Sequence, residues 1–264
     1  MSDIPQIKIY PDKFLGQVVI VTGAAQGIGQ VTSKLFASQG ATVVLVDIQK
    51  EKLESAVQQI KSSGRGEATY RLVNVADETQ INALIDDVIN TYGYIDVVVH
   101  LAGIYPTIPI IEFATDEYRR VMGVNMDGCF FLTRAVLPHM NKRGYGRIIC
   151  TSSGTLQLPP PGQAVYVAAK AAIMGFMRAI SVECGAGVTA NTILPGLIAT
   201  EAVKAKYLLP DGTRPFLQEL VQKQAVKRSG LPEDIAYTIC FIASPETAFT
   251  TGQIFDVGGG ATFH

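Results

Sequence analysis

Short apolar runs, rich in β-branched residues, alternate along the chain with stretches whose apolar positions recur every three or four residues. The runs are typical of buried parallel strands, and the recurring positions indicate helices that bury one side. This order predicts repeated βαβ units, and hence an α/β fold in which helices cover both faces of a mostly seven-stranded parallel sheet. The predicted strands are residues 17–22, 41–46, 69–73, 95–99, 146–151, 187–194 and 253–257.

Two of the helical stretches have recognisable boundaries. Asp77 offers an N-cap, Gln80 completes a capping box with it, and Gly93 ends the apolar stripe that follows. A longer helical pattern runs from Thr115 to about Arg143. The sequence therefore predicts one long helix before the fifth strand.

No linker interrupts the alternation, so residues 1–264 are predicted to form a single dinucleotide-binding and catalytic domain. Residues 1–16 are interpreted as an N-terminal extension. The stretch 197–228 contains Pro210 and Pro215 around a turn signal, and it is interpreted as a mobile flap over a substrate.

The helical pattern that begins near Gln163 is apolar on all sides. A helix of this kind must be covered around its whole circumference. One face can pack on the sheet, and the other is predicted to pack on a second subunit beside the helix of residues 122–131, which favours a homotetramer or a dimer. The apolar positions are Ala164, Val165, Val167, Ala168, Ile173, Met174, Phe176, Met177, Ile180 and Val182.

Composition narrows the class of protein further. Apolar residues make up 48% of the 264 residues and the formal net charge is -1, which argues against a disordered chain and against a nucleic-acid partner. No signal peptide is visible and no apolar run approaches about 18 residues, so no membrane partner is expected. The 4 cysteines lack C-x-x-C spacing and are predicted to be reduced thiols in a cytoplasmic protein. The 3 histidines show no ligand spacing, so no metal site is predicted.

Tyr166 and Lys170 are four residues apart and share one face of this helix. A cation in a partly desolvated site could lower the pKa of a phenol by about three units and let it act as a base at physiological pH. The pair alone is better explained by a surface tyrosine and a solvated lysine, so its sequence context has to decide. Ser153, which follows the predicted strand 146–151, adds a hydroxyl at the carboxyl end of the sheet.

Three glycines follow the first strand directly and open the first helix. Gly23, Gly27 and Gly29 would let the backbone approach a pyrophosphate and direct helix N-terminal N–H groups at it. The spacing is G-x3-G-x-G, and the alternative is an ordinary tight turn. With its flanking strand and helix, the loop favours a Rossmann-like dinucleotide site.

Asp47 closes the second strand, where a carboxylate would accept hydrogen bonds from the adenosine ribose and repel a 2′-phosphate. The alternative is that it caps the next helix. Neither Gln26 nor Ile48 is basic, so nothing stands ready for the extra phosphate of NADP. The predicted cofactor is NAD.

Together these motifs resemble the short-chain dehydrogenase/reductase family. The motifs are Thr22-Gly23-x3-Gly27-Ile28-Gly29, Asn125, Ser153 thirteen residues before Tyr166, Lys170, and Pro195-Gly196 with Thr200. They occur in the family's order and at its spacings, and the resemblance covers about residues 14–260. It implies the roughly 250-residue single-domain subfamily.

The resemblance implies roles for individual residues. Tyr166 resembles the catalytic acid/base, Ser153 the hydroxyl that binds the substrate oxygen, and Lys170 the residue that lowers the tyrosine pKa and holds the nicotinamide ribose. Asn125 resembles the residue that supports a water in the proton relay. The implied cofactor residues are Gly23, Gln26, Gly27, Ile28, Gly29, Asp47, Asn74, Val75, Ala102, Gly103, Tyr166, Lys170, Pro195, Gly196, Ile198 and Thr200, and the implied substrate residues are Ser153, Thr155, Leu156, Tyr105, Leu197 and Tyr207.

The chain departs from the family's pattern at three places. His100-Leu101 replaces the usual Asn-Asn before Ala102-Gly103, so the support that the first Asn side chain gives is expected to be lost. Asn74 stands where an Asp commonly contacts adenine. Gly258 replaces the Asp of the usual Val-Asp-Gly-Gly.

Mostly apolar residues are expected around the reacting carbon, which favours a small hydrophobic or aryl secondary alcohol or its ketone. A 3-oxoacyl thioester reductase is the first alternative, with Arg119 and Arg120 docking a carrier protein, although Asp47 opposes the NADPH that such reductases usually prefer. A non-catalytic dinucleotide-binding regulator is the second. Lys204, Lys206 and Arg214 on the flap are interpreted as solvated charges.

Overall fold

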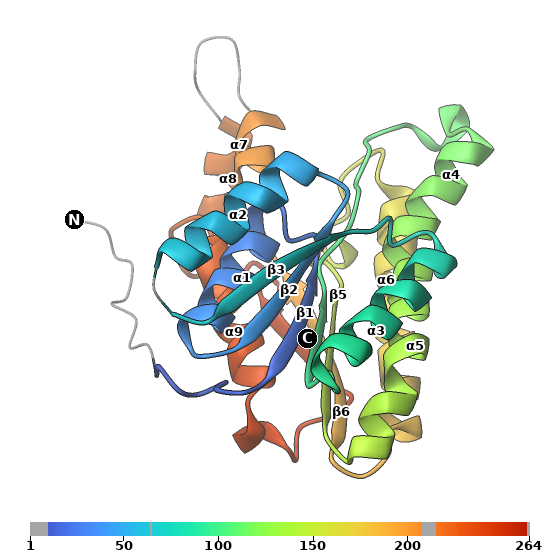
Figure 1. Cartoon of the computed structure of the whole chain (residues 1–264). Helices are drawn as coiled ribbons and strands as arrows, with labels where there is room; N and C mark the ends of the chain where they lie inside the picture. The colour runs from blue at the N-terminus through green and yellow to red at the C-terminus, as the bar shows by residue number, and fades with distance from the viewer. Residues whose placement is uncertain (1–9, 64, 207–214, 263–264) are drawn as a thin grey trace.

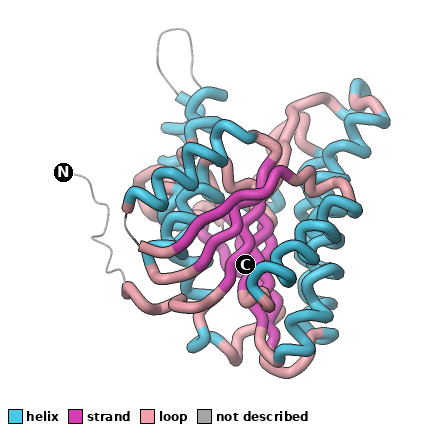
Figure 2. Tube along the Cα trace, viewed as in Figure 1, coloured by secondary structure: helices cyan, strands magenta, loops and turns pink. Residues whose placement is uncertain are grey.

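The core of the structure is a twisted parallel sheet, which Figure 2 shows in magenta between layers of helices. The computed structural model describes residues 10–63, 65–206 and 215–262. Within these ranges the strands are β1 (Val18–Thr22), β2 (Thr42–Asp47), β3 (Glu67–Leu72), β4 (Val97–His100), β5 (Gly146–Thr151), β6 (Val188–Pro195) and β7 (Ile254–Val257). They form one 7-stranded sheet in the order β3-β2-β1-β4-β5-β6-β7, with every pairing parallel. The predicted fold is confirmed.

Two helical layers cover the sheet, as Figure 1 shows. Successive residues of a strand point to opposite faces, so Val19 and Val21 of β1 enter one core while Val18 and Ile20 enter the other. Both cores are almost wholly apolar, which explains why the strands read as continuous apolar runs. The first core packs under α1 (Gly27–Ser38), α2 (Lys50–Ser62) and α9 (Pro232–Ile242), and the second under α3 (Glu78–Tyr92), α5 (Gly128–Arg143) and α6 (Ala164–Glu183).

Strand β1 is the point at which the chain reverses its direction of winding. It pairs with β2 on one side and with β4 on the other. Ligands of open α/β sheets bind outside the carboxyl ends of the strands at such a reversal. Functional side chains are therefore expected directly after Thr22 and His100, the last residues of β1 and β4.

The predicted long helix from Thr115 to Arg143 contains a π-helical turn. The stretch divides into α4 (Thr115–Met122), the π-helical turn η2 (Gly123–Asp127) and α5. The Asn125 side-chain Nδ2 donates to Val121 O at 2.9 Å, and this carbonyl is the acceptor that the backbone N–H of residue 125 would take in an α-helix. This competition gives a physical reason for the wider turn.

Helix α3 begins and ends as the sequence predicts, but its capping box is only half formed. The Asp77 side chain accepts from the backbone N–H groups of Thr79 and Gln80. The Gln80 side chain accepts from Asn74 N at 2.9 Å instead of from Asp77 N, because Asp77 N already donates to the Asn74 carbonyl. Gly93 ends the helix with φ of 85°.

The stretch interpreted as a flap, 197–228, contains two short helices. These are α7 (Glu201–Lys206) and α8 (Pro215–Lys223). The 207–214 segment, with Tyr207 and Pro210, lies outside the described residues. Short 3-10 segments occur elsewhere, namely η1 (Ile110–Glu112), η3 (Gly154–Leu156) and η4 (Pro245–Thr247).

Helix α6 packs only part of its apolar surface within this chain. Val165, Ala169, Ile173, Met177 and Ile180 are buried on one side. By length and composition it is the one helix in the described ranges that could span a membrane, and 28% of the relevant window is buried. Because this helix also carries Lys170 into the interior, it is a core helix of the sandwich.

Candidate active site

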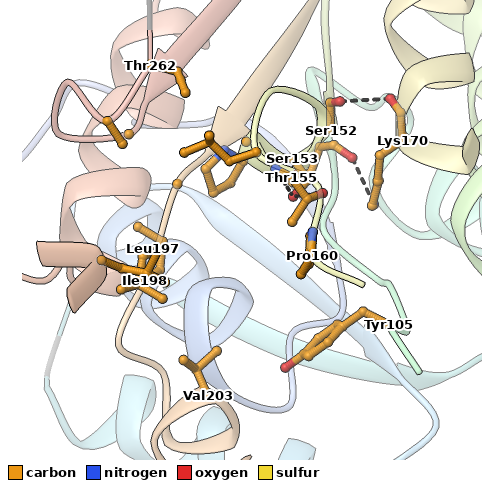
Figure 3. Close-up of a pocket in the computed structure, with 18 of the residues that line it drawn as sticks. Tyr105, Ser152, Ser153, Thr155, Pro160, Lys170, Leu197, Ile198, Val203 and Thr262 are labelled. Carbon is orange, nitrogen blue, oxygen red and sulfur yellow. Dashed lines mark hydrogen bonds between the residues drawn. The ribbon is translucent and has the colours of Figure 1, made fainter. Parts of the chain in front are cut away.

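A cavity of about 320 Å³ opens at the carboxyl ends of β4 to β7 (Figure 3). In this view Ser153 and Thr155 lie between Lys170 on one side and Leu197 and Ile198 on the other. The cavity collects residues that are far apart in the sequence. Predicted residues on its wall are Ile28, Gly103, Tyr105, Ser153, Thr155, Tyr166, Lys170, Pro195, Gly196, Leu197, Ile198 and Thr200.

Ser153 is placed by the end of β5, where the chain leaves the sheet and turns into η3. Its Oγ accepts from Thr155 N at 3.3 Å and from Thr155 Oγ1 at 2.9 Å. With both acceptor positions engaged by Thr155, the Ser153 hydroxyl proton is directed elsewhere. It is available to Tyr166, with which Ser153 also forms a hydrogen bond.

Tyr166 and Lys170 lie in the first two turns of α6, as their spacing predicts. The Lys170 ammonium donates to Thr151 O at 2.9 Å and lies 5.8 Å from the centroid of the Tyr166 ring. Ser152 Oγ donates to Lys170 O at 2.7 Å and fastens this part of the helix to the end of β5. The sheet and the helix therefore hold the serine, the tyrosine and the lysine in one wall.

The pKa values of these two groups differ from the expectation. Burial raises the pKa of Tyr166 to about 12, against the hydrogen bond from Ser153, which lowers it. Burial also lowers the pKa of Lys170 to about 8. The predicted lowering of the Tyr166 pKa by Lys170 is wrong for this structure, because the ammonium is directed at the Thr151 carbonyl and its charge is itself destabilised by burial.

Asn125 lies fully buried behind the cavity in the π-helical turn. Its Nδ2 donates to Ile104 O and Val121 O, both at 2.9 Å, while its Oδ1 has no hydrogen-bond partner among the described residues. A Cβ atom on Gly103 would lie 2.8 Å from this Oδ1 and 3.5 Å from Lys170 Nζ. Glycine at this position therefore leaves a polar space between the amide and the ammonium.

The glycine loop fits a pyrophosphate. Gly23 and Gly27 have φ of 67° and 57°, and a Cβ atom on Gly29 would lie 2.2 Å from Gly23 O. Gln26, the N-cap of α1, makes no side-chain capping bond, so the first N–H groups of this helix are left for another acceptor. The loop has the backbone geometry and the free donors that phosphate binding requires.

Asp47 stands at the end of β2 beside this loop. Its Oδ2 accepts from Ala25 N at 3.3 Å, and its Oδ1 accepts from Ile48 N at 2.7 Å and Gln49 N at 3.1 Å. The alternative that Asp47 caps α2 is not supported, because Gln49 is the N-cap of that helix. The carboxylate is instead tied to the glycine loop.

One cation near the loop was missed by the sequence reasoning. Lys52, in the first turn of α2, donates from Nζ to Gln26 Oε1 at 2.6 Å. The expectation that nothing stands ready for the extra phosphate of NADP considered only Gln26 and Ile48, whereas α2 brings Lys52, 26 positions after Gln26, to this loop.

The predicted adenine contacts lie after β3. Asn74 Oδ1 accepts from Ala76 N at 3.1 Å, so this side chain is already engaged in a local turn. Val75 is 5% exposed, and its side chain packs toward Gly128 of α5. Because the Val75 side chain is buried, only the backbone of Val75 is left to contact a cofactor.

The predicted substrate residues are only partly brought together. Tyr105, Thr155 and Leu197 line the cavity, whereas Leu156 does not and Tyr207 falls outside the described ranges. Leu158, two residues after the end of η3, lines the cavity instead of Leu156.

Helix α8 and the C-terminal segment contribute lining that the sequence reasoning missed. The i, i+3, i+4 spacing of Leu220, Lys223 and Gln224 was an available signal of a shared helix face. The missed residues are Leu101, Thr151, Ser152, Gly154, Pro160, Gln163, Val203, Leu220, Lys223, Gln224, Asp256, Gly258, Ala261 and Thr262.

Two of the departures from the family's pattern have a structural explanation. A Cβ atom on Gly258 would lie 2.7 Å from Asp256 Oδ1, so a side chain at this position would require the Asp256 carboxylate to move. His100 is fully buried, and its Nδ1 lies 3.0 Å from Thr22 Oγ1. The imidazole ring therefore supplies a hydrogen bond of its own at the position where the family has the first Asn.

Comparison with known proteins extends the likeness over almost the whole chain. A family model described as Enoyl-(Acyl carrier protein) reductase matches residues 23–262. The 3-oxoacyl-acyl-carrier-protein reductase FabG of Thermotoga maritima is 35% identical over 246 residues, which cover 93% of this chain and 97% of that protein.

Two further similarities concern proteins whose descriptions name NAD. The 2-dehydro-3-deoxy-L-rhamnonate dehydrogenase (NAD(+)) of a Sphingomonas species is 31% identical over 259 residues, covering 97% of this chain and 99% of that protein. A crystal structure of a 3-oxoacyl-acyl-carrier-protein reductase with bound NAD from Brucella melitensis has a TM-score of 0.87 at 31% identity, covering 98% of this chain and 97% of that one. With the fold and the motifs, these matches show that the chain belongs to the short-chain dehydrogenase/reductase family.

Proposed function

We propose that this protein is an NAD-dependent oxidoreductase that interconverts a secondary alcohol and its ketone by hydride transfer. The observation that carries the proposal is the convergence of Ser153, Tyr166 and Lys170 on one cavity wall next to the glycine loop. A proton donor or acceptor and a hydroxyl for the substrate oxygen then lie at the carboxyl ends of the strands, where a dinucleotide binds in this class of sheet.

Bound NAD would accept the hydride in alcohol oxidation and donate it, as NADH, in the reverse direction. The Ser153 hydroxyl, whose acceptor positions are engaged by Thr155, donates to the substrate oxygen and stabilises the charge that develops on it. Tyr166 takes the proton of the alcohol or returns it to the ketone oxygen. Its raised pKa makes it a better acid than base in this structure, so alcohol oxidation needs additional positive charge near the phenolate.

Lys170 is the cation of this wall and lies toward the polar space bounded by Asn125 Oδ1 and Gly103. In that position it could hold a nicotinamide ribose and relay a proton toward Asn125. Apolar residues cover most of the remaining wall and exclude water from the reacting atoms. Val203, Leu158 and Leu220 are among them.

The preference for NAD over NADP rests on Asp47. Its carboxylate is fixed beside the glycine loop, where it would bind ribose hydroxyls and repel a 2′-phosphate. Lys52, which donates to Gln26, places a positive charge near the loop and would partly offset this repulsion of a 2′-phosphate. Two of the similar proteins are described with NAD, which agrees with this preference.

A small hydrophobic or aryl alcohol is the substrate class that the cavity favours, because its volume is modest and its lining largely apolar. A 3-oxoacyl thioester reductase is the second candidate, supported by the names of similar proteins. Arg119 and Arg120 give little support to carrier-protein docking, because they pair with Asp116 and Glu117 of the same helix.

The test is an absorbance screen for NADH and NADPH turnover with a panel of secondary alcohols, ketones and 3-oxoacyl thioesters. Tyr166→Phe should lose turnover by at least about a hundredfold while NAD affinity stays within about threefold, since general acid–base catalysis contributes ~10²–10⁴-fold. Tyr118→Phe, at an exposed position of α4, is the matched control. Full activity in Tyr166→Phe would remove the proposed acid/base, and NAD binding without turnover of any compound would favour the regulator.

Self-association as a homotetramer or dimer and a cytoplasmic location stay predictions. The exposed side of α6 supports the first, since Val182 is 85% exposed and Phe176 contacts the partly exposed Phe130 of α5. Light scattering at micromolar concentration measures it.

A further inference from the structure

His100 ends β4 at the carboxyl edge of the sheet, directly opposite Thr22 of β1 in the strand register. The side chain is fully buried, and its Nδ1 lies 3.0 Å from Thr22 Oγ1. Thr22 is the residue before the glycine loop, and His100 is followed by the segment that leads to Gly103. The imidazole therefore joins the two loops between which the cofactor is proposed to bind.

The hydrogen bonds around Thr22 define the tautomer of this histidine. Thr22 Oγ1 accepts from Leu101 N and Ala102 N, both at 3.2 Å. A hydroxyl oxygen has two acceptor positions and one proton, so the Thr22 O–H donates to His100 Nδ1. Burial, and then the positive charge of Lys170, lower the pKa of His100 to about 3, so the ring is neutral. Its proton therefore resides on Nε2.

The opposite edge of the ring faces the π-helical turn η2 and the start of α5. A Cβ atom on Gly128 would lie 3.2 Å from His100 Cε1, which is tighter than an ordinary van der Waals contact, so glycine lets the helix approach the ring without displacing it. Polar contacts with the backbone of Asn125 and Val124 favour the charged, doubly protonated ring and act to raise the His100 pKa, but burial outweighs them. Within the described part of the chain, Nε2 is buried and has no partner at hydrogen-bond distance.

We propose that His100 is a positioning residue: its buried neutral ring is fixed to β1 through Nδ1, lies against the π-helical turn and the start of α5, and thereby holds Asn125 at the proposed proton relay. An amide such as Asn is smaller than an imidazole and fills less of the space between Thr22 and the turn. The inference rests on the proposed function for the role of Asn125. The tautomer and the contact with the turn do not depend on it.

The first measurement is two-dimensional nitrogen–proton NMR of the full chain, which reports the tautomer and charge of each imidazole. With 3 histidines in the chain, His139→Gln and His100→Asn assign the signals. We expect His100 to keep a proton on Nε2 alone between pH 5 and 8. A proton on Nδ1, or a ring that becomes charged in this interval, would overturn the proposal whether or not the protein is an oxidoreductase.

The second measurement is a double-mutant cycle on turnover and on NAD affinity, with His100→Leu and Asn125→Ala. Loss of one positioning contact should lower kcat about tenfold in His100→Leu, and less than about twofold when Asn125 is already Ala. His100→Asn should recover part of the loss, and His139→Gln should leave kcat unchanged. Equal losses in both backgrounds would show a purely structural histidine and overturn the positioning role.

If the wild-type protein turns over no substrate, the proposed function fails. The NMR result and the same cycle on NAD affinity then still decide the inference. A loss of NAD affinity in His100→Leu that Asn125→Ala does not diminish would count against it.

Discussion

The burial of Lys170 should cost the protein stability that a neutral side chain would recover. Lys170 is 3% exposed and its pKa falls from 10.5 to about 8. A difference of this size corresponds to about 3 kcal/mol of unfolding free energy at pH 7. Lys170→Met removes this cost but also loses the hydrogen bond from the ammonium to Thr151 O, which contributes about 2 kcal/mol because the donor is charged. We expect a net gain of roughly 1 kcal/mol at pH 7.

The pH dependence identifies the cause of this gain. Because the folded-state pKa is lowered, the cost is complete below pH 8 and disappears as the pH rises toward the unfolded value of 10.5. Urea unfolding at one protein concentration should therefore show the stability of Lys170→Met relative to the wild type falling by about 2–3 kcal/mol between pH 7 and pH 10.

Exposed Lys61→Met in α2 is the control and should show no such trend. An advantage that is absent at pH 7, or equal at pH 7 and pH 10, would refute the reasoning. Lys170→Met should also lose turnover, because Lys170 belongs to the proposed active site and is retained there at a cost in stability.

Three further predictions concern the cofactor and the proton. Asp47→Ala with Ile48→Arg should shift the ratio of kcat/KM values toward NADP by at least about tenfold, since it replaces a repulsive charge with an attractive one; unchanged NAD selectivity would rule out Asp47 as the discriminating group. Gly29→Ala should weaken NAD binding by more than about tenfold in calorimetry, because its Cβ would lie 2.2 Å from Gly23 O; unaltered affinity would contradict the proposed phosphate loop. Initial rates of alcohol oxidation should rise with pH from 6 to 10 while those of ketone reduction stay level, because the raised pKa of Tyr166 keeps the base form scarce and the acid form abundant; a flat oxidation profile over this range would argue against this base.

Much of the fold was accessible from the sequence because local and global signals agree. Apolar runs such as Val18–Thr22 are stable only when buried, which predicts central strands, and the glycines that follow this run predict a tight turn into a helix. Asn125 was placed correctly in a helix, but the π-helical turn around it was not predicted. That turn depends on a side-chain bond to Val121 O, which competes with the helix and leaves no trace in hydrophobic periodicity.

Other parts of the site could not be predicted from the sequence, because they depend on contacts between elements that are far apart in the chain. The spacing of Tyr166 and Lys170 predicts that they share a face, but the direction of the ammonium depends on Thr151, a carbonyl from another element. The spacing of Leu220, Lys223 and Gln224 indicates a shared helix face, but it does not show whether that face meets a core or a cavity. Lys223 and Gln224 on that face could be recognised only once the tertiary structure placed them at the cavity.

The cavity wall divides into two parts of different origin. Ser153, Tyr166 and Lys170 are held by the sheet and a helix packed against it, whereas Val203, Leu220 and Thr262 come from the segments after β6 and β7. The reactive machinery can therefore be inherited unchanged while the recognition half diversifies. Such a separation lets one scaffold acquire new specificities by exchange of peripheral segments, and it makes those segments the natural place for redesign.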